Sequence, residues 1–144
     1  MHDRFQWFEE GVLAGSEMPE AEDIKFLFDK GIEAIISLEP LSKETEEEIK
    51  RRCIAHYTLY LKEGDTPSCR ELEEFFEILY HEILLKHPVL IHSRYGKGRT
   101  NLMAGLWLIR ERNLSFHQVM EKAGPVETGS QENFWRNFSL KHGG

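Results

Sequence analysis

The sequence predicts an α/β domain whose central twisted sheet is mostly parallel and carries helices on both faces. Short apolar strands alternate along the chain with segments of helical periodicity, which is the pattern of strand–helix–strand units. The chain of 144 residues is also 40% hydrophobic, which is enough to bury one core. We therefore expect residues 1–144 to form a single domain.

Strands and helices of the first half are separated by turn residues. The expected strands are Phe5–Phe8, Val12–Ala14, Ile32–Leu38 and Ile54–Leu61. An amphipathic helix over Pro19–Lys30 precedes Gly31, and Ser42 can cap a short helix that runs to Arg52. The alternation expected of an α/β domain therefore begins near the N-terminus.

The second half repeats this alternation. Ser68 and Glu71 form a capping box for a helix that we expect Pro88 to break, and the short apolar strand Val89–Ile91 follows. The remaining elements are three expected helices: one from near Arg99 through Arg110 that Asn113 stops, one over Ser115–Ala123, and one opened by a capping box at Thr128 and Gln131.

The charge balance limits the partners of this chain. Its 25 acidic residues outnumber 18 basic ones, giving a net charge of −7, which disfavours binding to nucleic acid or to an anionic membrane. The sequence contains no apolar run long enough to span a membrane and no apolar signal-peptide core. Its two cysteines, Cys53 and Cys69, do not make a disulfide scaffold. We expect a cytoplasmic monomer whose anionic ligands bind at a local positive site.

The segment His92–Thr100 has the features of such a site. It joins a strand to a helix, and ligands of open α/β sheets bind beyond the carboxyl ends of strands. Gly96 and Gly98 let the backbone curl, so that successive N–H groups and the helix N-terminus can surround an anion. Arg99 can grip two phosphate oxygens. The other phosphate-binding positions expected in the loop are Arg94, Tyr95 and Lys97.

This loop, His92-Ser93-Arg94-Tyr95-Gly96-Lys97-Gly98-Arg99-Thr100, resembles the signature H-C-x-x-G-x-x-R-[S/T] of the protein-tyrosine phosphatase superfamily. Every fixed position fits except the cysteine, which is replaced by Ser93. Trp7–Ser16 is similar to the opening hairpin of small dual-specificity phosphatases. Gly124–Glu132 resembles their R-P-G-x-h-x-T-x-x-Q-E segment, with Lys122-Ala123 in place of Arg-Pro. The resemblance implies the cysteine-phosphatase fold.

The resemblance also implies hydrolysis of phosphomonoesters through a phosphocysteine, without metal or cofactor. In this family His92 would orient the loop, Arg99 would hold the phosphate oxygens and Thr100 would hydrogen-bond the sulfur of the nucleophile. A loop that lowers the pKa of a thiol enough to form a thiolate cannot ionise a hydroxyl, because the intrinsic pKa of a hydroxyl is far higher. Ser93 should therefore be a very poor nucleophile. We interpret Ser93 as a substitution for cysteine, because the other catalytic positions are intact. A natural pseudophosphatase that binds phosphorylated residues is the alternative.

The general acid is expected on the turn before Pro67. The family often places an aspartate four residues ahead of a proline, which corresponds to Glu63, whereas Asp65 has the usual chemistry two residues later. The alternative is that neither carboxylate is an acid catalyst and both only solvate the turn. Glu127 and Gln131 match the region that positions water in the family, although Gln131 is also the partner in a capping box.

Phosphotyrosine in a protein is the first expected substrate, with phosphoserine and phosphothreonine next. Inositol phosphates and phosphoinositides are the runner-up, because Arg94 and Lys97 occupy the positions of the lysines in the H-C-K-A-G-K-G-R-T signature of phosphoinositide 3-phosphatases. The expected partners are thus phosphorylated proteins or small phosphoesters, with phosphate, sulfate or another oxyanion in the loop.

Overall fold

The computed structural model describes residues 4–142, and within them one five-stranded sheet has the order β1-β2-β5-β3-β4. The strands are β1 (Gln6–Glu9), β2 (Leu13–Ser16), β3 (Ala34–Ser37), β4 (Ala55–Thr58) and β5 (Val89–His92). β1 runs antiparallel to β2, and all other neighbours are parallel. The register places Ser16 and Ser37 on either side of His92 at the carboxyl edge.

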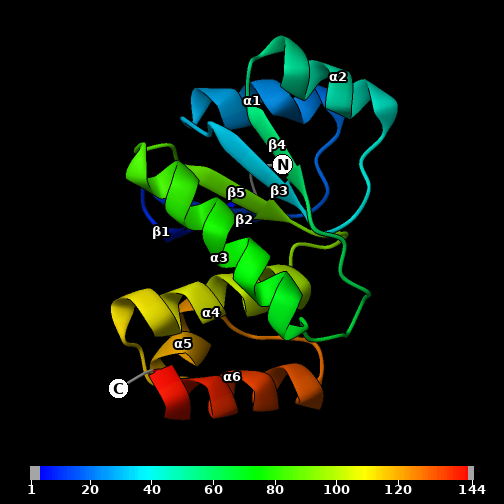
Figure 1. Cartoon of the computed structure of the whole chain (residues 1–144). Coiled ribbons are helices and arrows are strands. Elements are labelled where there is room, and N and C mark those ends of the chain that lie inside the picture. The colour runs from blue at the N-terminus through cyan, green and yellow to red at the C-terminus, as the bar shows by residue number, and fades with distance from the viewer. Residues whose placement is uncertain (1–3, 143–144) are drawn as a thin grey trace.

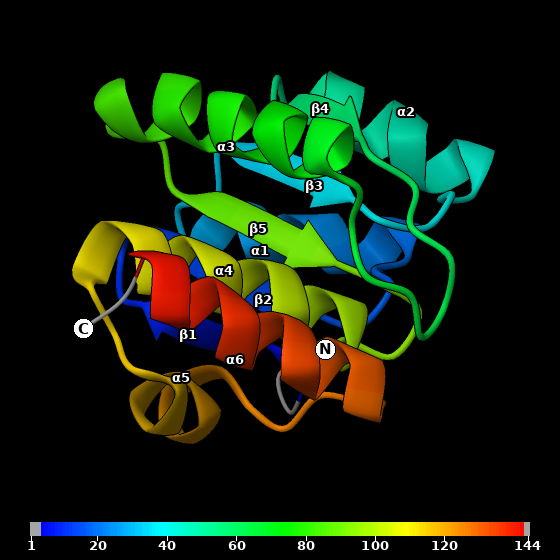
Figure 2. The same ribbon diagram turned by 60° about the horizontal axis from the view of Figure 1, so that its bottom comes forward.

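Helices cover both faces of this sheet (Figures 1 and 2). One face carries a 3-10 turn (Ala21–Asp23), α1 (Ile24–Asp29) and α2 (Lys43–Arg51). The other face carries α3 (Cys69–Leu84), α4 (Arg99–Arg112), α5 (Phe116–Ala123) and α6 (Gly129–His142). The predicted fold class, a mostly parallel sheet with helices on both faces, is confirmed.

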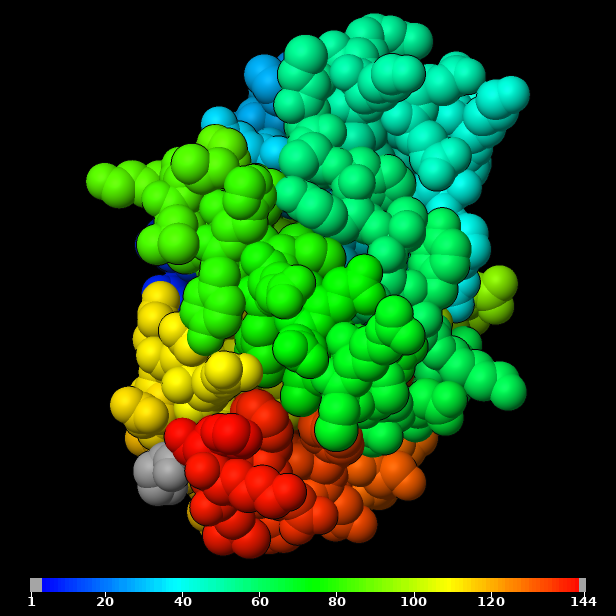
Figure 3. Space-filling model, viewed as in Figure 1, coloured from blue at the N-terminus to red at the C-terminus, as the bar shows by residue number. Residues whose placement is uncertain are grey.

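The larger part of the core surrounds α4. Every residue from Arg99 to Ile109 is buried, because α5 and α6 pack against this helix and the sheet lies on its other side. Figure 3 shows α3 across the centre of the surface and α6 below it. A smaller apolar cluster lies between the sheet and α1 and α2, and the sheet contributes Ile35 and Leu90 to it. The first turn of α4 is therefore held in place from several sides, which matters because the expected phosphate loop leads into it.

Most of the predicted helix boundaries hold. The Ser68 hydroxyl accepts from the backbone N–H of Glu71 at 3.1 Å, and Asn113 ends α4 with a φ of 55°. One prediction was wrong: Pro88 does not break α3. The helix ends at Leu84, and Lys86 then adopts a φ of 62°, so the chain reverses before Pro88 is reached.

Two predicted strands and the first helix proved too long. The strand expected over Ile32–Leu38 spans only Ala34–Ser37, and the one expected over Ile54–Leu61 spans Ala55–Thr58. α1 begins at Ile24, after a 3-10 turn. The apolar runs continue past the strand ends because Leu38, Leu59 and Leu61 are still buried. Backbone pairing also continues for a short distance: the Leu38 N–H donates to the His92 carbonyl at 3.0 Å and the Leu59 N–H to the Ser37 carbonyl at 2.9 Å. The apolar pattern therefore follows burial rather than the bounds of the regular strands.

Candidate active site

The carboxyl ends of the four parallel strands meet at the loop that follows β5. Residues after β2, β3 and β4 all contact it or the arginine that ends it. The backbone N–H of Met18 donates to the carbonyl of Arg94 at 3.3 Å, which fastens the loop to the end of β2. The site predicted at this edge of the sheet is thus assembled from segments that are far apart in the sequence (Figure 2).

Two glycines let the loop pack as closely as it does. Gly96 has a φ of 71°, and an added Cβ would lie 2.6 Å from the carbonyl carbon of Ser16. Gly98 has a φ of 43°, and an added Cβ would lie 1.8 Å from Oε1 of Glu127. A side chain at position 96 would collide with the backbone after β2, and one at position 98 would push the Glu127 carboxylate away from the loop. The Glu127 carboxylate consequently lies directly against the loop.

Ser93 lies at the bottom of this loop and is 2% exposed. Its Oγ is 2.7 Å from Oγ1 of Thr100, the contact expected for the nucleophile of the family, and it donates weakly to the Lys97 carbonyl at 3.4 Å. Among residues 4–142, no imidazole or carboxylate hydrogen-bonds to this hydroxyl. No general base within the described part of the chain is therefore placed to activate Ser93.

The ring of His92 does not hydrogen-bond to the Ser93 hydroxyl. It is buried, and its Nε2 lies 2.6 Å from Oγ of Ser37. Burial lowers the pKa of His92 to about 3, so the ring is neutral at physiological pH. This arrangement supports a structural part for His92 at the base of the loop.

Arg99, the first residue of α4, is 2% exposed. Its Nη1 donates to Oε1 of Glu39 at 2.9 Å and to the carbonyl of Leu61 at 2.7 Å. These two acceptors fix the plane of the guanidinium before any ligand arrives, and Nε remains without a partner among the described residues. Glu39 was not predicted from the sequence. Its position, the first polar residue after a buried strand, could have indicated it, since ligand sites form beyond such strand ends.

The turn with the two candidate acids lies on the surface beside α6. Glu63 and Asp65 are both exposed, and neither carboxylate makes a hydrogen bond within the described part of the chain. The backbone of the turn is held instead. Thr128 donates from Oγ1 to the Gly64 carbonyl at 3.2 Å, and Gln131 donates from Nε2 to the Asp65 carbonyl at 3.2 Å.

The Gln131 side chain is completely buried and its amide is already in use. Besides its contact with the turn, its Oε1 accepts from the backbone N–H groups of Glu127 and Thr128 at 2.9 and 3.3 Å. Thr128 returns a contact by accepting from the Gln131 N–H at 3.1 Å, which completes the predicted capping box. Gln131 therefore supports both α6 and the turn that carries Glu63 and Asp65, which we call the acid turn. The exposed Glu127 carboxylate lies against the phosphate loop.

The loop tip presents positive charge to solvent. Arg94, Tyr95 and Lys97 are exposed, and the Arg94 guanidinium lies 6.0 Å from the centre of the Tyr95 ring. The segment after α5 lies beside the same loop, where Asn101 donates from Nδ2 to the Pro125 carbonyl at 2.7 Å. This contact anchors the segment in which Lys122-Ala123 replaces the Arg-Pro of the family.

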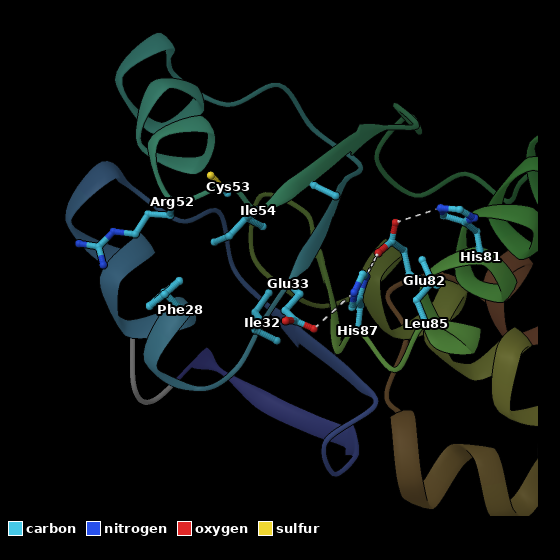
Figure 4. Close-up of a pocket in the computed structure, with 11 residues that line it drawn as sticks. Phe28, Ile32, Glu33, Arg52, Cys53, Ile54, His81, Glu82, Leu85 and His87 are labelled. Carbon is cyan, nitrogen blue, oxygen red and sulfur yellow. Dashed lines mark hydrogen bonds and ion pairs between the residues drawn. The ribbon is translucent and has the colours of Figure 1, made fainter.

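A cavity of about 270 Å³ lies at the amino ends of the strands, away from the phosphate loop (Figure 4). It contains the buried Glu82, which accepts hydrogen bonds from Tyr57 at 2.5 Å and from His87 at 2.8 Å. Burial works against ionisation of Glu82, but these two hydrogen bonds, together with the charges of His87 and His81, outweigh it and lower the pKa of Glu82. The carboxylate is fully engaged with protein groups and is far along the strands from the phosphate loop.

The described residues contain no cluster of three or more histidine, cysteine or acidic side chains that could hold a metal ion. No helix among them is long and apolar enough to cross a bilayer. Cys53 and Cys69 are both exposed and unpaired with each other.

The acid turn can be tested in a chain that also carries Ser93→Cys. We expect Glu63→Gln to flatten the basic limb of the pH–rate profile and to slow esters with poor leaving groups by about 10²-fold, because protonation of the leaving oxygen is lost. Asp65→Asn should cost less, since Asp65 is displaced from the expected position. Equal and small losses from both changes would instead indicate that the carboxylates only solvate the turn.

Comparison with known families agrees with this site. The family model Tc-R-P, described as a polymorphic toxin system DSP-PTPase phosphatase, matches residues 12–113, most of the chain. That range contains the sheet from β2 onward, the phosphate loop and α4.

Solved phosphatase structures share the fold. Tk-PTP in its active form has a TM-score of 0.83 at 22% identity, with 98% of this chain and 99% of that chain covered. PTPMT1 in complex with PI(5)P has a TM-score of 0.79 at 17% identity, with 96% of both chains covered. A cysteine-to-serine form of P. aeruginosa TpbA in complex with pTyr has a TM-score of 0.67 at 16% identity, with 96% and 87% covered.

Proposed function

The chain belongs to the Tc-R-P family of DSP-type tyrosine phosphatases, and from this premise we propose that residues 92–100 bind the phosphate of a phosphotyrosine-containing protein. With cysteine at position 93, the loop would cleave the ester through a phosphocysteine, using Glu63 or Asp65 as the acid. With Ser93, it would hold the phosphate without turning it over. Phosphoserine and phosphothreonine proteins are further substrates of the same chemistry.

One observation carries this proposal: the buried Arg99 guanidinium is pre-aligned by Glu39 and Leu61 beside the Ser93–Thr100 pair. Burying a guanidinium costs free energy that a structural role alone would rarely justify in so small a domain. An oxyanion in the loop would receive charge-assisted hydrogen bonds from that group and from the helix N-terminus. TpbA, whose serine form is crystallised with pTyr, is a precedent for binding without a cysteine nucleophile.

Inositol phosphates and phosphoinositides form the second candidate substrate class. The exposed Arg94 and Lys97 on the loop tip favour them, because they could meet additional phosphate groups. PTPMT1, which shares the fold, is crystallised with PI(5)P. Competition between a phosphotyrosine peptide and a soluble inositol phosphate for the Ser93 protein would rank the two classes.

We expect the Ser93 protein to bind phosphate or a phosphotyrosine peptide in calorimetry. Arg99→Ala should abolish detectable binding, because about 1.5–3 kcal/mol per charge-assisted hydrogen bond is lost from more than one bond. Lys50→Ala is the matched control: it removes one exposed positive charge from α2 and should leave the affinity unchanged. Undiminished binding by Arg99→Ala, or equal losses in both variants, would show that the anion binds elsewhere.

A further inference from the structure

A cavity of about 280 Å³ lies beside the phosphate loop, and we call it the Arg4 cavity. The loop contributes Tyr95, Gly96 and Lys97 to its wall. The rest of the wall comes from segments that are far apart in the sequence, namely Arg4 and Gln6 near the start of β1, Asn101 in α4 and Pro125 after α5. The fold therefore places a hollow directly against the residues that are proposed to bind phosphate.

The Arg4 cavity is cationic, although the chain is acidic overall with a net charge of −7. Arg4 and Lys97 line it, and none of the described residues that line it is acidic. A second cavity, of about 420 Å³, has the opposite character, because its wall contains three glutamates, Glu20, Glu22 and Glu44. Met18 lines this second cavity and donates to the carbonyl of Arg94 in the loop at 3.3 Å. An anionic group near the loop is thus attracted toward the Arg4 cavity and repelled from the acidic one.

A buried amide fixes the shape of the Arg4 cavity. Asn101 is 3% exposed, and its Nδ2 donates to the Pro125 carbonyl at 2.7 Å. Its Oδ1 accepts a weak hydrogen bond from Nε2 of Gln6 at 3.4 Å. These two contacts join β1, α4 and the segment after α5, which are the parts of the chain that enclose the cavity. Gln6 is exposed, and its amide nitrogen carries a second N–H that can donate to a ligand.

An ion pair orients Arg4 without using up its donors. Its Nη1 lies 3.2 Å from Oε2 of Glu17, the residue after β2, and the Arg4 side chain is 52% exposed. A guanidinium has five N–H donors, so one contact with Glu17 leaves others for a ligand. Exposed ion pairs of this kind stabilise a protein only slightly, so an incoming anion can replace Glu17 at little cost. Glu17 is therefore a weak competitor for the same guanidinium.

We propose that the Arg4 cavity receives a second anionic group of the substrate whose phosphate lies in the loop, an inference that rests on the proposed function. Lys97 connects the two places: its carbonyl accepts from the Ser93 hydroxyl at 3.4 Å, and the same residue lines the cavity. In a phosphotyrosine protein, the second group is the carboxylate of an aspartate or glutamate close to the phosphotyrosine. In an inositol phosphate, it is a second phosphate. A guanidinium binds either group.

Calorimetry of the Ser93 protein with pairs of ligands that differ in the second charge tests this proposal. One pair consists of phosphotyrosine peptides that carry glutamate or glutamine beside the phosphotyrosine, and the other of an inositol monophosphate and an inositol bisphosphate. We expect the more highly charged member of a pair to bind about threefold to tenfold more tightly, as exposed charge-assisted contacts allow. The pair with the larger gain identifies the source of the second group, and equal affinities within both pairs would overturn the proposal.

Substitutions at Arg4 and Glu17 then locate the second group. Arg4→Gln should reduce the gain to less than about twofold, whereas Arg4→Lys keeps the charge and should keep most of the gain. Glu17→Gln removes the competitor and should enlarge the gain. The matched control is Arg51→Gln, which takes an arginine out of another exposed ion pair, with Glu48 of α2. Equal losses in Arg4→Gln and Arg51→Gln would indicate a general effect of net charge and would contradict the site.

Inorganic phosphate separates the failure of this site from the failure of the proposed function. If phosphate binds and its binding requires Arg99, but Arg4→Gln leaves the gain intact, only the Arg4 cavity is ruled out. If neither phosphate nor any of the peptides and inositol phosphates binds, the proposed function is wrong and the second site is ruled out with it.

Discussion

Replacing Ser93 by cysteine is expected to give a chain that hydrolyses para-nitrophenyl phosphate faster than the Ser93 protein, on the order of 10⁵-fold, as for other enzymes that depend on one nucleophile. The thiol would sit where the Ser93 hydroxyl is buried, at the N-terminus of α4 beside Arg99. That environment lowers the pKa of a thiol by several units, so that a thiolate exists at neutral pH. A serine hydroxyl in the same place stays protonated, and none of residues 4–142 is hydrogen-bonded to it as a base.

The reaction should proceed unchanged in the presence of chelators, because the proposed chemistry uses no metal. Ser93→Ala is the control that keeps the loop but offers neither thiol nor hydroxyl. Cys53 and Cys69 remain in every variant, so any thiol-dependent rate that appears belongs to position 93. A Ser93→Cys protein that is folded and shows no turnover from mildly acidic to mildly basic pH would contradict the proposed enzyme.

Arg99→Lys in the Ser93→Cys chain is the second large expected effect, a loss of about 10³-fold in kcat/KM. An ammonium cannot make the planar two-pronged contact with phosphate, and it cannot satisfy Glu39 and Leu61 in the same geometry. Much of the loss should appear in kcat, because negative charge on the oxygens is held most tightly in the transition state.

Arg70→Lys provides the matched control for this variant. Arg70 lies exposed in the first turn of α3, and its replacement should leave both kinetics and unfolding temperature unchanged. Thermal unfolding of Arg99→Lys must be measured as well, since the arginine is buried. Kinetics equal to those of the Arg70→Lys protein would mean that Arg99 does not contact the reacting phosphate.

The fold and the loop could be predicted from sequence because their signals are local. Alternation of strands and helices needs only the order of residues, and the spacing of Gly96, Gly98 and Arg99 sits within one segment. The capping boxes at Ser68 and Thr128 were equally visible, because each involves residues three apart.

What the sequence could not reveal depends on the order of strands in the sheet. Glu39 reaches Arg99, and His56 reaches His92 through Ser37, only because β3 lies between β4 and β5. Nothing near those residues in the sequence carries that order. The end of α3 was mispredicted for a different reason. The chain reverses at Lys86, whose backbone has a positive φ that a lysine in the sequence does not indicate.

The attachment of the acid turn to α6 has a consequence for local stability. Thr128 and Gln131, at the start of α6, hold the carbonyls of Gly64 and Asp65, although they lie beyond the segment 12–113 that the family model matches. Amide exchange measures how often such a helix end opens, and helix ends usually open more often than the core. Each opening of the first turn of α6 would release the turn as well. We therefore expect the position of the proposed acid, Glu63 or Asp65, to depend on the fraying of a helix that forms no part of the phosphate loop.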